Sequence, residues 1–185
     1  MRFLRFMRIF IPLLVVAAIV AGVVVVLSSR SELQSARGRV DDTWKPLRTA
    51  LDARYQTLAA ANDAVRKTPG PLHQLVVAID RANRDWGDLE ANGGSVAAQV
   101  TAANRLEALG RRLVVAARAA PRLAGKPALA TVDAFATLAP PKSAAAHFAA
   151  AVSHYERERD RPARRLAAGL LGYKAVPAYD ASGSA

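Results

Sequence analysis

The side chains of this sequence that could do chemistry are few, and their spacing does not suit a metal site. Of the three histidines, His147 and His154 lie seven residues apart on one predicted helix. They share a face but stand about two turns from each other, too far apart to bind one metal ion without other ligands. The neighbouring "HYERERD" is not a metalloprotease HExxH pattern, because the first Glu follows only after Tyr155. The histidines are therefore expected to be structural.

Other reactive groups are also missing or poorly placed. Asp41 and Asp42 are adjacent, so on a helix they diverge by about 100° and make a poor carboxylate pair. The chain has no cysteine, which excludes disulfides, thiolate metal sites and cysteine nucleophiles. Glycine-rich phosphate-binding loops and the G-x-S-x-G pattern are absent as well. The sequence therefore predicts no enzymatic activity, no cofactor and no metal.

The first thirty residues favour a membrane anchor. Residues 9–27 contain no charged residue, and a helix of this length is about 30 Å long, the thickness of a bilayer's hydrocarbon core. The run is longer than the apolar region of a cleavable signal peptide and contains no small-x-small site, so cleavage is disfavoured. The basic flank 1–8 precedes it. Its dense arginines favour a cytoplasmic N-terminus, with the following residues on the extracytoplasmic side of the cell membrane.

Residues 28–160 have the periodicity of packed helices. Apolar residues recur every three or four positions, which is typical of a one-sided amphipathic helix, at Leu33, Ala36, Val40, Trp44, Leu47, Leu51, Tyr55, Leu58, Ala61 and Val65. Pro46 is expected to kink or break this helix near Trp44. Trp44 and Trp86 are expected to be core anchors, because the other apolar residues are mostly Ala, Val and Leu.

Breakers divide the remaining helices. A second helix is expected over 72–89, a third from about Ser95 to Pro121, a short one over 128–138, and a last long one from an N-cap at Ser143 to about Asp160. Such helices, joined by short loops, bury their apolar faces only against each other. The predicted fold class is all-α: an N-terminal transmembrane helix followed by an elongated antiparallel helical bundle of about four long helices.

The net charge of +11 is compatible with anionic lipid or nucleic acid, and equally with an arginine-rich solvated surface. The most charged stretch, "YERERDRPARR", interleaves acids with its arginines, so a ladder of local ion pairs explains it and no nucleic-acid binding is expected. Arg161, Arg164 and Arg165 stand next to an apolar strip and are candidate contacts for a lipid surface.

The C-terminal tail, residues 161–185, is unusually apolar for a chain end, which is ordinarily polar and frayed. Two alternatives fit. The tail packs against its own bundle, or it docks into another membrane protein. The candidate docking residues are Leu166, Gly169, Leu170, Leu171, Gly172, Tyr173 and Lys174.

Both ends of the chain resemble the LemA family. The stretch "RVDDTWKPLRTALDARY" is similar to that family's opening pattern, with Val40, Asp41, Trp44, Leu47, Leu51, Arg54 and Tyr55 at the matching positions. A turn around Pro121 and Leu123 is similar too. The last segment resembles the family's close through Tyr155, Pro162, Ala168, Gly169, Gly172, Tyr173, Lys174, Pro177 and Tyr179.

The resemblance implies a membrane-anchored helical bundle with no established enzymatic activity. We therefore expect a scaffold or adaptor that acts through contacts with an envelope protein, with membrane lipid bound through the anchor and homo-oligomers left open. The alternative is a peripheral module that binds anionic lipid through its basic C-terminal helix.

Overall fold

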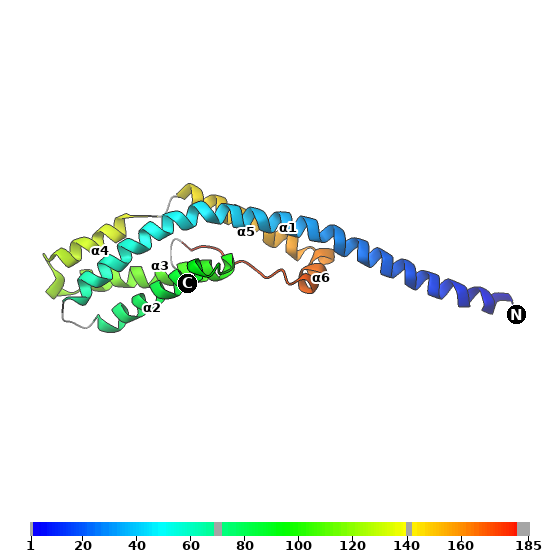
Figure 1. The fold of residues 1–185 in the computed structure, drawn as a ribbon, viewed down its shortest axis with the longest axis horizontal. Coiled ribbons are helices and arrows are strands. Elements are labelled where there is room, and N and C mark those ends of the chain that lie inside the picture. The colour runs from blue at the N-terminus through cyan, green and yellow to red at the C-terminus, as the bar shows by residue number, and fades with distance from the viewer. Residues whose placement is uncertain (1, 69–71, 140–141, 181–185) are drawn as a thin grey trace. The chain divides into compact units, whose positions relative to one another are not determined.

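Every regular element that this computed structural model describes is helical. The described backbone covers residues 2–68, 72–139 and 142–180. Within these ranges, side chains are described from residue 28 onward, except that of residue 163. The elements are α1 (Arg2–Arg66), α2 (His73–Ala91), α3 (Val96–Arg118), the 3₁₀ turn η1 (Pro121–Leu123), α4 (Pro127–Thr137), α5 (Lys142–Asp160) and α6 (Pro162–Leu171) (Figure 1). The predicted all-α class is confirmed.

Helix α1 carries the apolar stripe that the sequence predicted. All ten positions of the stripe are buried, each with at most 3% of its surface exposed. Of the kink or break expected at Pro46, the break does not occur, since α1 continues through this residue without interruption. Pro46 lies on the exposed side of the helix, where water can solvate the carbonyl that loses its hydrogen-bond donor. The buried residues Trp44 and Leu47 on either side hold the helix in register.

The predicted anchor at residues 9–27 lies in the N-terminal part of α1. Its side chains are outside the described residues. Among the residues that are described, no helix is both long enough and apolar enough to cross a membrane.

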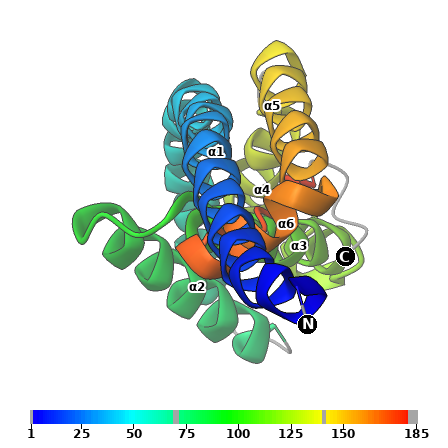
Figure 2. The ribbon, with the colours of Figure 1, turned by 90° about the vertical axis from the view of Figure 1, so that its right-hand side faces the viewer.

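Helices α2 and α3 form a hairpin, lying side by side in both views (Figure 1 and Figure 2). The turn follows from its sequence: Gly93 adopts a left-handed φ of 65°, and the Gly94 amide donates to the Leu89 carbonyl at 2.7 Å. Ser95 then caps α3, its hydroxyl accepting from the Ala98 amide at 3.3 Å. These are the boundaries that the breakers predicted.

Helix α4 packs on α3 through a close approach at one glycine. A Cβ atom on Gly110 would stand 2.5 Å from Cζ of the Phe135 ring, well inside van der Waals contact. The side chain of Phe135 is itself 1% exposed. The absence of a side chain at position 110 therefore lets the Phe135 ring approach the backbone of α3 this closely.

The start of the last long helix differs from the prediction. Helix α5 begins at Lys142, so Ser143 lies inside its first turn and is not the N-cap. Its predicted end at Asp160 is confirmed. A second, shorter helix, α6, begins two residues later at Pro162. Proline is well suited to the first position of a helix, because the amide hydrogen that it lacks would have no partner within the helix there.

The chain divides into two compact units: residues 1–39 with 154–174, and residues 40–153 with 175–185. The core of the second unit is an aromatic cluster. Trp44 packs edge-on against Trp86 with ring centroids 6.4 Å apart, and contacts Phe148 at 5.1 Å. Both indole nitrogens donate to side-chain oxygens, Trp44 to the buried Gln99 at 2.5 Å and Trp86 to the half-buried Asp52 at 2.9 Å. The tryptophans are core residues, as predicted.

Candidate functional site

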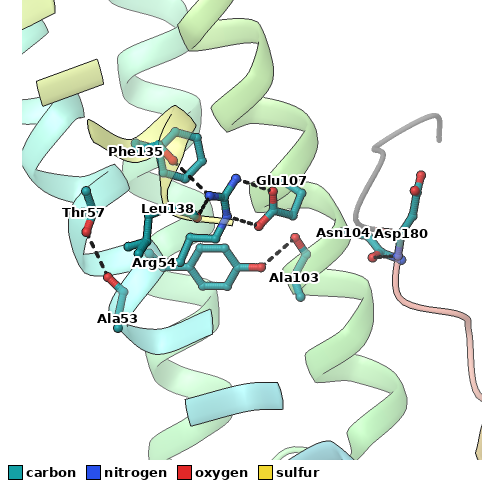
Figure 3. Close-up of polar contacts among 10 residues, drawn as sticks. Ala53, Arg54, Thr57, Ala103, Asn104, Glu107, Phe135, Leu138 and Asp180 are labelled. Carbon is teal, nitrogen blue, oxygen red and sulfur yellow. Dashed lines mark hydrogen bonds and ion pairs between the residues drawn. The ribbon is translucent and has the colours of Figure 1, made fainter. Parts of the chain in front are cut away.

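A buried ion pair joins three helices of the second unit. The Arg54 guanidinium on α1 donates through Nε and Nη2 to the two carboxylate oxygens of Glu107 on α3, at 2.7 and 2.9 Å (Figure 3). Its Nη1 donates to the backbone carbonyls of Phe135, at 2.9 Å, and of Leu138. The guanidinium also stacks on the Phe135 ring at 4.1 Å. All three guanidinium nitrogens are therefore engaged, and the pair sets the register of α1, α3 and α4.

This ion pair was not predicted from the sequence: Arg54 was singled out only as a position similar to the LemA pattern, and no role was predicted for Glu107. The signal was present, because Glu107 lies four residues after the buried Ala103 and three before Gly110, on the buried face of α3. A charged residue on a buried face requires a partner, and Arg54 on the stripe-bearing helix is such a partner.

Two tyrosines lie near the ion pair. The Tyr55 hydroxyl donates to the Ala103 carbonyl at 3.1 Å. Burial raises the pKa of Tyr55 far above its usual value, and the negative charge of Glu107 raises it further. Burial and then Glu107 likewise raise the pKa of Tyr179 in the C-terminal segment. Both hydroxyls therefore stay protonated at neutral pH and act as neutral polar groups.

The extended C-terminal segment is held on α3 by one amide side chain. Asn104 donates from Nδ2 to the Ala178 carbonyl at 2.9 Å and accepts through Oδ1 from the Asp180 amide, also at 2.9 Å. Figure 3 shows Asn104 and Asp180 facing each other at the surface of α3. Val176, two residues before this clamp, is 4% exposed. This part of the tail packs on its own domain.

The apolar part of the tail behaves differently. Residues 162–171 form α6, whose end is closed by Gly172 at φ 73° with the Tyr173 amide donating to the Ala168 carbonyl at 2.9 Å. Ala167 and Ala168 are buried, whereas Leu166, Leu170 and Leu171 are 73, 78 and 39% exposed. Within its own unit, α6 therefore packs through Ala167 and Ala168 and leaves these three leucines uncovered.

Helix α6 is held in the first unit by ion pairs and one hydrogen bond. Arg164 pairs with Glu32 of α1 and with Glu158 of α5. Arg161 pairs with Glu158 at 3.1 Å. At the other end, the buried Tyr155 hydroxyl donates to the Lys174 carbonyl at 2.9 Å. The polar contacts hold both ends of α6 and leave its leucines exposed.

The predicted site residues thus fall into two groups. The candidate docking residues Leu166, Gly169, Leu170, Leu171, Gly172 and Lys174 are exposed, and Tyr173 is half-buried. Of the three candidate lipid contacts, Arg161 and Arg165 are exposed. Arg164 has only 16% of its side chain exposed, so its charge serves the ion pairs with Glu32 and Glu158.

Among the described residues, no group of three or more His, Asp or Glu side chains is arranged to hold a metal ion. His147 and His154 lie in different units. No family model matches the chain, and searches of curated proteins and of solved structures likewise found no match.

Proposed function

We propose that this protein is a single-pass membrane protein of the LemA type, whose helical domain acts as a scaffold in the cell envelope and catalyses no reaction. One observation carries the proposal: residues 9–27 and the buried stripe belong to one uninterrupted helix, α1. The apolar run is about 30 Å long, which is enough to cross a hydrocarbon core. By the charge rule, the helices after it are assigned to the extracytoplasmic side of the membrane.

The residues that carry the LemA resemblance support a structural role. Trp44, Arg54 and Tyr55 are buried and hydrogen-bonded to α3 or α4. Tyr155, in the last long helix, is buried and bonded to the Lys174 carbonyl. Buried residues that hydrogen-bond to neighbouring helices or to the backbone stabilise the fold and are not available to bind a substrate. The exposed apolar residues, among them Val115 at 70% exposure, are the surfaces through which a scaffold makes contacts.

The absence of native cysteines makes the first test direct. Single cysteines replace Ser182 and, as the matched control, Phe3 on the other side of the predicted anchor. Both full-length variants should stay in the membrane fraction after alkaline carbonate washing. A membrane-impermeant maleimide applied to intact cells should label the cysteine at 182 and spare the one at 3.

Extraction of the chain by carbonate would contradict the anchor. Labelling at position 3 but not at 182 would reverse the orientation. The scaffold role is tested by a photo-cross-linking amino acid at Val115 in cells, with exposed Arg122 as the control position. Discrete protein adducts are expected at 115 and not at 122. Their absence at 115 would contradict contacts through this surface.

A further inference from the structure

The exposed face of α6 has the composition of a helix that lies on a membrane surface. Leu166 and Leu170 are four residues apart, so they share one side of the helix, and Leu171 extends that side. The helix, "PARRLAAGLL", contains no acidic residue. Among the described side chains of α6, the buried ones are those of two small alanines, Ala167 and Ala168. The large apolar side chains therefore point away from the protein, with arginines nearby, which is the pattern of an interfacial helix.

The position of α6 along α1 agrees with this composition. Arg164 pairs with Glu32, which lies only five residues beyond Leu27, the end of the apolar run. Five residues of helix rise about 8 Å, and the headgroup region on each side of a bilayer is also several ångströms thick. With residues 9–27 in the hydrocarbon core, the Glu32–Arg164 pair therefore stands at the level of the headgroups.

The charges around the leucines select the kind of surface. Arg165 lines a shallow depression together with Leu166, Gly169 and Leu170, and the depression is completed by Asp160 and Pro162. Asp160 is paired with Arg159 at 3.3 Å. Glu158 is paired with Arg161 and Arg164, and Glu32 is paired with Arg164 as well. Glu158 serves two arginines with one negative charge, so the exposed Arg161, Arg165 and Lys174 leave a net positive rim beside the leucines, which complements anionic headgroups.

We propose that α6 is an interfacial helix: Leu166, Leu170 and Leu171 enter the outer part of the bilayer that holds the anchor, and Arg161, Arg165 and Lys174 contact anionic headgroups. The proposal rests on the proposed function, because the anchor at residues 9–27 sets the level of the membrane. It extends that function by assigning a second lipid contact to the soluble part of the chain.

The test uses the full-length chain in vesicles of phosphatidylcholine with or without phosphatidylglycerol. A single cysteine replaces Leu170 and carries an environment-sensitive fluorophore. The matched control is Val115→Cys, an apolar position in the other unit that is 70% exposed, against 78% for Leu170. Lipids with a quencher near the headgroup should quench the probe at 170 several-fold more strongly than the probe at 115. Its emission should also shift to shorter wavelength.

Charge dependence is tested with Arg161→Gln and Arg165→Gln together, in the Leu170→Cys background. The double change, or the omission of phosphatidylglycerol, should reduce quenching at 170 several-fold. Equal quenching in all these cases would overturn the role of the arginines. Circular dichroism of each variant should match that of the unmodified chain. When lysine instead of glutamine replaces Arg165, the positive charge is kept, so the quenching at position 170 should be restored.

The outcomes separate this inference from the proposed function. A chain that resists carbonate while its probe at 170 is not quenched keeps its anchor and refutes the α6 contact. If that probe is shielded from aqueous iodide yet not quenched by lipid, a protein covers α6 and the lipid proposal fails. If the chain is extracted by carbonate, the anchor fails, and quenching measured before the wash still decides whether α6 contacts lipid.

Discussion

Arg54 and Glu107 form a bidentate ion pair inside the second unit, where Arg54 is 7% exposed and Glu107 is 1% exposed. They are 53 positions apart in the sequence and belong to different helices. The arginine also donates to two carbonyls at the end of α4. This single side chain therefore satisfies polar groups of three helices, and its loss affects all of them.

Glu107→Ala should lower the free energy of unfolding by about 3–5 kcal/mol, because it leaves the Arg54 charge buried without its partner. The measurement is urea unfolding of the detergent-solubilised full chain, followed by circular dichroism. Replacing both residues by leucine should cost less than either single alanine change, since no unpaired charge remains. A double variant that is less stable than both single variants would contradict this account.

Gly110→Ala should destabilise the protein by roughly 1–3 kcal/mol, because the new methyl group overlaps the Phe135 ring. Gly87→Ala is the matched control. Gly87 lies inside α2 with no atom within 4 Å of an added Cβ, so this change should stabilise the helix by about 0.5–1 kcal/mol. Thermal unfolding of both variants checks the prediction, and equal effects at the two positions would refute the close approach of α3 and α4.

Asn104→Ala should release the C-terminal segment while the rest of the fold is kept. The lost hydrogen bonds to Ala178 and Asp180 contribute about 0.5–1.5 kcal/mol each, so amide exchange at Asp180 should become faster. Asn104→Asp keeps the acceptor and loses the donor, and its exchange should be intermediate. Hydrogen-exchange mass spectrometry of the C-terminal peptide provides the measurement. Unchanged exchange in Asn104→Ala would show that other contacts hold the segment.

The tyrosines predict a loss of stability at alkaline pH. Because burial raises the pKa of Tyr55, the folded protein holds this proton more tightly than the unfolded chain does, where the pKa is near 10. The stabilisation is fully present below pH ~10 and is lost progressively above it. Unfolding measured between neutral and alkaline pH should show this decline, with tyrosinate absorbance appearing as the protein unfolds. Tyr55→Phe should flatten the decline, and a decline of unchanged slope would assign it to other groups.

Much of the fold could be predicted from the sequence because its signals are local. The stripe on α1 has a helical period over many turns, and all its positions are buried. The α2–α3 turn could be placed because glycine and serine favour specific cap geometries there. For the opposite reason, the sequence does not show that α1 continues through Pro46 without a break. The local cost of the proline is outweighed by the packing of Trp44 and Leu47, which a window around the proline does not reveal.

The candidate sites depended more on contacts between distant residues. The sequence indicated an unusual apolar tail and its leucines, but not that they lie on a separate helix, since Gly169 weakens the helical signal in "LAAGLLGYK". In the sequence, nothing distinguishes Arg164 from the neighbouring arginines. In the structure it is paired with Glu32, which lies more than a hundred residues earlier in the chain. The partners of Glu107 and Asn104 are likewise distant: the helical pattern indicates that Glu107 needs a partner, but it does not identify Arg54, and it gives no sign of the contacts of Asn104.

The clamp at Asn104 recognises only main-chain atoms, the carbonyl of residue 178 and the amide of residue 180. It is therefore indifferent to the side chain at position 178, which can vary among related sequences without loss of the contact. Position 180 is less tolerant. Proline there would remove the amide hydrogen that Asn104 accepts, so a chain that keeps asparagine at 104 should avoid proline at 180 while accepting almost any residue at 178.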